Sequence, residues 1–102
     1  MSSFQKIAVK SDLPPGKMKE YKIADKTIVV ANAGSEYFAF DGICTHEHCA
    51  LAGGYLDDHT LTCYCHGAQF DITSGKVLSP PAPSPINIYP VKLEGDDILV
   101  EI

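Results

Sequence analysis

The chain has 102 residues, enough for one domain with a modest core, and its 45% hydrophobic and 21% charged residues are ordinary for a globular protein, which argues against disorder. The formal net charge of −5, from 13 acidic against 8 basic residues, argues against a nucleic-acid-binding protein, which needs a basic face to neutralise phosphates. No apolar run is long enough to cross a bilayer and the start MSSFQKIAVK lacks the apolar core of a signal peptide, so we expect a soluble, cytoplasmic protein without membrane contact.

The first 40 residues alternate short apolar stretches with turn residues, a pattern typical of antiparallel strands. The breaker DLPPG separates the first two stretches, because proline cannot donate a hydrogen bond within a sheet. Turns are predicted at Asp25–Lys26 and at AGSE. The predicted strands cover residues 4–9, 18–23, 27–33 and 37–40.

From Asp41 to Gly54 the sequence is loop-like and rich in Cys, His and Gly. Short strands are predicted after it at 61–64 and 69–72, closed by the turn TSGK. The segment 79–85 (SPPAPSP) has four prolines in seven residues and predicts a stiff, irregular loop. A terminal hairpin is predicted from strands 86–93 and 98–102. We find no helical periodicity longer than a turn or two, so the pattern predicts a single all-β domain over 1–102, built as a sandwich or small barrel.

Cysteine and histidine gather in two short segments of the chain. The first is CTH (44–46) and the second is CYCH (63–66), which makes the candidate ligands Cys44, His46, Cys63 and His66. Thiolate and imidazole are ligands for zinc, copper and iron–sulfur sites. Each segment offers one sulfur followed by one nitrogen, so two facing segments can supply both sulfurs to one iron and both imidazoles to another, as in a Rieske centre. A zinc finger of the usual kind has both Cys before both His; a structural zinc site is the alternative.

Residues 44–67 resemble the signature of the Rieske iron–sulfur family, C-x-H followed by C-x-x-H-G. The length of the chain and its stretch TSGKVLSPPAPSP are most similar to the ferredoxin components of ring-hydroxylating dioxygenases. The resemblance implies a Rieske-type antiparallel β-sandwich with a cluster-binding subdomain of two loops at about 42–83. It also implies one [2Fe–2S] cluster, with the inner iron on Cys44 and Cys63 and the outer iron on His46 and His66.

The two other cysteines, Cys49 and Cys65, match in position the disulfide that ties the cluster loops of Rieske subunits in cytochrome bc complexes. The resemblance therefore implies this pairing, although many dioxygenase ferredoxins lack it. Two buried thiols are the alternative, because disulfides are rare in the cytosol.

Residues beside the candidate ligands are expected to lower the reduction potential. High-potential members of the family carry Ser and Tyr where this chain has Ala68 and Phe70, so two hydroxyl donors to sulfur are missing. Glu47 adds negative charge. We expect a potential in the lower part of the Rieske range of roughly −150 to +300 mV.

Two interpretations are open for three other nearby residues. Leu51, Tyr64 and Pro81 either shield the cluster from water or are ordinary loop packing. Glycines at 53, 54 and 67 are expected to allow backbone turns close to it. Solvated loop and turn positions are expected for His48, Asp57, Asp58 and His59.

The expected function is that of a monomeric one-electron carrier, not an enzyme. It would accept an electron from a reductase and pass it to an oxygenase or similar acceptor. No nucleophile–base set is visible, and nothing outside residues 44–66 could bind the second iron of an oxygenase. The alternatives are a small electron-transfer or regulatory subunit of a nitrite reductase-type assembly and a structural zinc-binding module.

Overall fold

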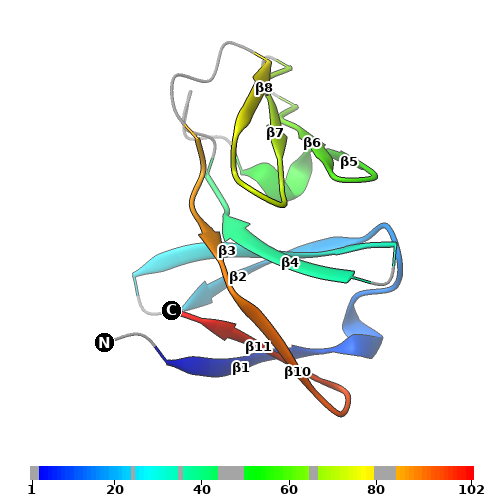
Figure 1. Ribbon diagram of the computed structural model, residues 1–102, viewed down its shortest axis with the longest axis vertical. Coiled ribbons are helices and arrows are strands. Elements are labelled where there is room, and N and C mark those ends of the chain that lie inside the picture. The colour runs from blue at the N-terminus through cyan, green and yellow to red at the C-terminus, as the bar shows by residue number, and fades with distance from the viewer. Residues whose placement is uncertain (1–2, 24, 35, 44–49, 65–66, 80–84) are drawn as a thin grey trace.

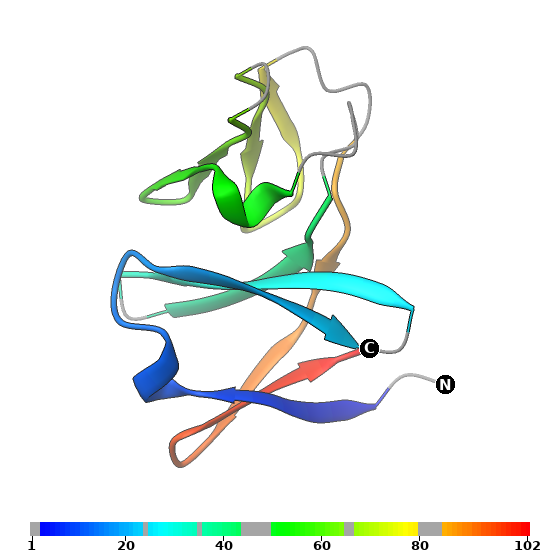
Figure 2. The same ribbon diagram turned by 180° about the vertical axis from the view of Figure 1, so that it is seen from behind.

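Three antiparallel sheets lie in tiers, one above the other (Figures 1 and 2). The structure, a computed structural model, describes residues 3–23, 25–34, 36–43, 50–64, 67–79 and 85–102. The lower sheet has the order β1 (Phe4–Val9), β11 (Asp97–Glu101), β10 (Val91–Glu94). The middle sheet has the order β2 (Met18–Ile23), β3 (Lys26–Ala33), β4 (Glu36–Asp41), β9 (Ile88–Tyr89). The upper sheet has the order β5 (Tyr55–Asp57), β6 (Thr60–Thr62), β7 (Gln69–Asp71), β8 (Val77–Ser79).

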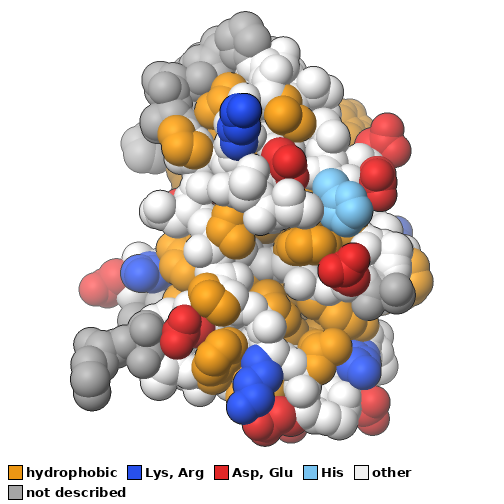
Figure 3. All heavy atoms as spheres, in the orientation of Figure 1, with side chains coloured by type: hydrophobic (Ala, Val, Ile, Leu, Met, Phe, Trp, Pro, Cys, Tyr) orange, Lys and Arg blue, Asp and Glu red, His pale blue; other side chains and the backbone are white. Residues whose placement is uncertain are grey.

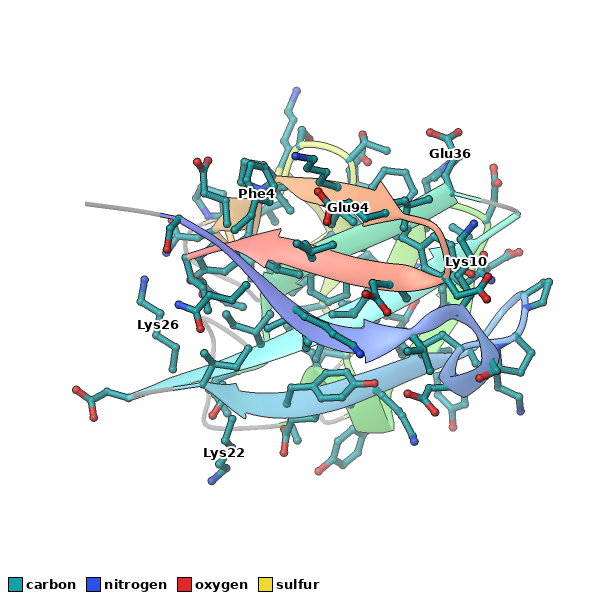
Figure 4. The ribbon with its side chains drawn as sticks, turned by 90° about the horizontal axis from the view of Figure 1, so that it is seen from below. Phe4, Lys10, Lys22, Lys26, Glu36 and Glu94 are labelled. Atoms are coloured by element: carbon teal, nitrogen blue, oxygen red, sulfur yellow. The ribbon has the colours of Figure 1, made fainter. Side chains whose placement is uncertain are left out.

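The helical content of the described residues is two short 3₁₀ helices, η1 (Lys10–Asp12) and η2 (Leu51–Gly53). The all-β prediction is therefore confirmed, and the lower and middle sheets form the predicted sandwich. On the face shown in Figure 3, acidic and basic side chains are interspersed with apolar ones. Figure 4 places Lys22, Lys26 and Glu36 at the rim of the molecule, where their charges stay hydrated.

The central strand β3 is buried on both faces, which explains its unbroken apolar run. Ile28 and Val30 point into the lower core, between the lower and middle sheets. Val29 and Ala31 point into the upper core, between the middle and upper sheets. The period-two alternation of a strand thus gives one side chain to each core in turn, and β3 is the common wall of both.

One polar residue, Asn32, is buried near the end of this apolar strand with 3% of its surface exposed. Its side-chain Nδ2 donates a hydrogen bond of 2.8 Å to the carbonyl of Leu13. Its backbone N–H donates to the carbonyl of Lys17, and its own carbonyl accepts from the N–H of Gly16. These bonds fix the β1–β2 connection, including the predicted DLPPG breaker, against the end of β3.

The predicted strands at 4–9 and 18–23 coincide with β1 and β2, and those at 27–33 and 37–40 fall within β3 and β4. The prediction of one strand at 86–93 is wrong, because the chain passes from β9 in the middle sheet to β10 in the lower sheet at Pro90. Proline has no N–H to donate; its carbonyl accepts instead from the N–H of Glu101 at 3.0 Å.

In the upper sheet, strands β5 and β8 were not predicted, and the predicted strand 61–64 ends earlier, at Thr62. Each of the upper strands is only three residues long. The β5–β6 connection is a two-residue turn, with Asp58 at a positive φ of 55°. Such short strands carry too few residues to show an alternation of their own.

Candidate metal centre

Cys63 is the one candidate ligand that lies within the described residues. Cys44, His46 and His66 lie outside them, as do the other predicted site residues Glu47, His48, Cys49, Cys65 and Pro81. The described part of the chain therefore shows the frame from which the two ligand segments extend. It holds no group of three or more His, Cys, Asp or Glu side chains able to bind a metal ion.

The first ligand segment starts and ends against the tip of β4. Ile43 and Ala50 form an isolated antiparallel bridge, and the N–H of Leu51 donates a 2.8 Å hydrogen bond to the carbonyl of Gly42. Gly42 itself lies so close to Thr27 that a Cβ added there would be 2.6 Å from the Thr27 methyl carbon. The two ends of residues 44–49 are thus held together on the middle sheet.

The second ligand segment is a tight turn between β6 and β7. The N–H of Cys63 donates to the carbonyl of Ala68 at 2.7 Å, and the N–H of Gly67 donates to the carbonyl of Cys63 at 3.1 Å. Gly67 has a φ of 78°, a conformation that glycine adopts without strain, which confirms the predicted backbone turn. Below the turn, the Gln69 side chain donates to the Thr62 hydroxyl at 3.1 Å. The backbone of Cys63 is therefore fixed on both sides.

The short helix η2, which begins just after residues 44–49 in the chain, packs against β6 and Cys63. Leu51 of η2 and Cys63 are both buried in the upper core, with 0% and 1% of their surfaces exposed. Gly54 approaches the backbone of β6 so closely that an added Cβ would lie 2.2 Å from the Thr62 carbonyl oxygen. Gly53 and Gly54 therefore lie where a side chain would meet a neighbour, and their predicted closeness to the cluster stays a prediction.

The proline-rich residues 80–84 lie outside the described residues, but the chain on either side of them is held in place. Ser79 at the end of β8 pairs with Gln69, just past the Cys63–Ala68 turn. The returning chain is fixed lower down, where the N–H of Ile86 donates to the carbonyl of Gly75 at 3.0 Å. Pro81 lies outside the described residues, so its predicted shielding role stays a prediction.

Asp41, the last residue of β4, is hydrogen-bonded to two residues that follow the proline-rich segment, Asn87 and Tyr89. Its Oδ1 accepts a 2.6 Å hydrogen bond from the Tyr89 hydroxyl, and its Oδ2 accepts a 2.9 Å bond from the N–H of Asn87. Burial, together with the Asp41 carboxylate, raises the pKa of Tyr89 to about 12. Lys26 Nζ lies 5.3 Å from the centre of the Tyr89 ring. Sequence analysis missed this network; the Asp-Gly pair after YFAF was a signal only for the start of a loop.

Several predicted neighbours of the ligands lie around this frame. Ala68 and Phe70 are fully buried in the upper core, while the Tyr64 residue is 52% exposed. His59 and Asp58 form the β5–β6 turn, as predicted, and Asp57 ends β5. The His59 ring also packs edge-on against Phe38 of the middle sheet, with ring centres 5.4 Å apart.

The candidate cysteine and histidine ligands fit an iron–sulfur centre, both in their chemistry and in the placement of Cys63. Thiolate and imidazole together suit zinc, copper or an iron–sulfur group. A cysteine whose residue is 1% exposed, in an apolar core at the end of a strand, has the low solvent access that tunes such a centre.

Comparison with known proteins identifies the family. The model of the Rieske [2Fe–2S] domain matches residues 3–90, so the chain belongs to the Rieske family. The chain is 41% identical over 97 residues to the biphenyl 2,3-dioxygenase ferredoxin component of Rhodococcus jostii (strain RHA1), covering 95% of this chain and 91% of that protein. It accordingly binds one Rieske-type [2Fe–2S] cluster and is an electron-transfer component.

Solved structures agree with this assignment. The ferredoxin of Sphingomonas yanoikuyae B1 superposes with a TM-score of 0.91 at 28% identity, covering 98% of this chain and 99% of that one. A chain from the complex of reduced oxygenase and oxidized ferredoxin in carbazole 1,9a-dioxygenase superposes with a TM-score of 0.89 at 26% identity, covering 95% and 91%. The predicted Rieske-type fold is therefore confirmed. Among the described residues, no helix is long and apolar enough to span a bilayer.

Proposed function

We propose that this chain carries single electrons from a reductase to an oxygenase, and that Cys44, His46, Cys63 and His66 hold its cluster. When bound, the cluster supplies a site that takes up and releases one electron. Cys63 and Cys44 would bind the inner iron, and the two histidines the outer one. The observation that supports the assignment is the close packing of Gly53 on Tyr64 and of Gly54 on Thr62, because Gly53 follows the first ligand segment closely in sequence and Tyr64 belongs to the second.

The oxygenase as acceptor is supported by the relatives, which are named as ferredoxin components of dioxygenases. We further propose that the protein works as a monomer in the cytoplasm. Cys49 and Cys65 would form a disulfide across the two ligand segments. The domain would be a single unit with its cluster-binding part at about 42–83.

The ligand assignment is tested by spectroscopy of the reduced protein. We expect wild-type protein to be brown-red with the rhombic EPR signal of a Rieske centre, and Cys63→Ser and His66→Ala to lose it. His48→Ala, which removes a histidine from the first segment without removing a predicted ligand, should keep the signal. A colourless wild-type protein that contains zinc would overturn the proposal.

The acceptor is tested by reconstitution. The reduced protein is mixed with a dioxygenase of the biphenyl class and, separately, with a nitrite reductase large subunit. Product formation that requires this chain and an added reductase is expected with the oxygenase. Turnover with the nitrite reductase but not with the oxygenase would establish the alternative function. Intact mass before and after thiol reduction tests the Cys49–Cys65 pairing.

A further inference from the structure

The side chain of Tyr64 links the turn that carries Cys63 to η2, in addition to the hydrogen bonds described above. It belongs to the second segment and directly follows Cys63. A Cβ added to Gly53 in η2 would lie 3.0 Å from Tyr64 Cε1 and 3.3 Å from Cδ1, so one side of the ring is already in close contact with the η2 backbone. η2 in turn follows the first ligand segment and is bonded back to Gly42 through Leu51.

The exposure of Tyr64 contrasts with the burial of its neighbours. The Tyr64 residue is 52% exposed, whereas its neighbour Cys63 is 1% exposed and Leu51 of η2 is fully buried. The ring is therefore partly exposed to water and partly packed against Gly53.

We propose that Tyr64 is a positioning residue for the metal centre, which holds the Cys63 turn against η2 and keeps water out of the line of contact between them, the seam. This rests on the proposed ligand set. A tyrosine ring suits the role because it covers a large area and has only two side-chain torsions to order. An alanine at position 53 would bring its Cβ to 3.0 Å from Tyr64 Cε1, tighter than an ordinary contact, so the ring would have to shift by a few tenths of an ångström.

The charge of the centre gives the direction of the expected effect. Two ferric ions, two sulfides, two thiolates and two neutral imidazoles sum to zero, so uptake of one electron creates a net negative charge. Water stabilises the charged state more than an apolar surrounding does. Admitting water at the seam should therefore favour the reduced form and raise the midpoint potential.

The experiment is a double-mutant cycle on the cluster-loaded protein, with Tyr64→Ala, Gly53→Ala and the double variant. We expect both single variants to raise the midpoint in voltammetry. We also expect them to bleach about fivefold faster in the presence of an iron chelator, the factor for a contact of about 1 kcal/mol. Because Gly53→Ala acts by displacing a ring that Tyr64→Ala has removed, the double variant should change the potential less than the sum of the singles.

Two controls separate positioning from general destabilisation. Tyr64→Phe keeps the ring and should have the wild-type midpoint. Tyr55→Ala removes an even more exposed tyrosine, 69% exposed, from β5 of the upper sheet and should leave the midpoint unchanged. Midpoints of the two single variants that stay at the wild-type value or fall, or shifts that simply add in the double variant, would overturn the role of Tyr64. Loss of the Rieske spectrum from wild-type protein would instead overturn the ligand set.

Discussion

Ala68 and Phe70 are fully buried beside the Cys63 turn, and neither carries a hydroxyl. A serine or tyrosine hydroxyl in that place can donate a hydrogen bond to a cluster sulfur, which disperses negative charge and favours the reduced state. We therefore expect Ala68→Ser with Phe70→Tyr to raise the midpoint potential in voltammetry. Phe38→Tyr adds the same hydroxyl to the middle sheet and serves as the control. An unchanged or lowered midpoint in the double variant would contradict this account.

Tyr89 donates its hydroxyl to a carboxylate, which makes its ionisation dependent on Asp41. Burial first, and then Asp41, raises its pKa to about 12, above the usual value of 10.0. The raised pKa means that Tyr89 adds stability below pH 10, and that this contribution is lost as the pH rises through about 12.

Replacing Asp41 by Asn should lower the Tyr89 pKa part of the way towards 10.0, because burial still opposes the phenolate. Ultraviolet difference titration measures the shift, with Tyr89→Phe identifying the signal. Asp96→Asn removes the same charge from the β10–β11 turn and should leave the Tyr89 titration in place. If Asp41→Asn and Asp96→Asn gave the same Tyr89 pKa, Asp41 would not be the cause.

At the scale of elements, the β7–β8 turn is fixed by a glycine in close contact with the returning chain. Gly75 has a φ of 81°, and an added Cβ would lie 2.1 Å from the Ile86 carbonyl oxygen. Gly34 has a similar φ of 69° but open space around it.

Gly75→Ala should lower the free energy of unfolding by about 3 kcal/mol, because backbone strain and a steric clash add up. Gly34→Ala should cost about 1 kcal/mol, from strain alone. Urea denaturation of both variants measures the difference. Equal losses would show that the contact with Ile86 relaxes without cost.

The elements that could be predicted from the sequence are those with a periodicity of their own. The run TIVVANA has enough β-branched residues to define β3 without any neighbour. YLD and VLS, which form β5 and β8, have three residues each and become strands because β6 and β7 offer them partners. The break at Pro90 had a visible signal, a proline within an apolar run, which was outweighed by the alternation around it.

For the site, the sequence was informative about the types of ligand but not about the backbone and hydrogen bonds that hold the segments carrying them. The order of Cys and His in two segments predicted the class of centre because ligand chemistry is local. Asp41 bonds to Asn87 and Tyr89, which follow it in the sequence by 46 and 48 positions. No local pattern encodes such a contact. The same holds for the Tyr64–Gly53 contact.

At the scale of the whole molecule, β3 separates two cores that can be perturbed independently. Val29 and Val30 are neighbours in sequence and both fully buried, but Val29 belongs to the upper core with Cys63 and Val30 to the lower one. Val29→Ala and Val30→Ala should each cost about 2 kcal/mol of stability, measured by urea denaturation.

The two valine variants should differ in retention of the cluster. Val29→Ala opens space in the upper core, to which Cys63 belongs, and should speed bleaching by an iron chelator, whereas Val30→Ala should not. Both proteins remain mostly folded at this loss, so the comparison can be made under native conditions. Equal bleaching rates would show that the two cores behave as one.

The double burial of β3 also affects how the chain finds its pairing during folding. In a strand with one polar face, a slip by one residue would bury polar side chains, and this penalty sets the register. Between Ile28 and Ala31 a slip exchanges apolar residues for apolar residues, so the penalty is small there. Asn32 restores it, since only one alignment brings its amide to the carbonyl of Leu13. This asparagine therefore favours a single pairing register in an otherwise uniformly apolar strand.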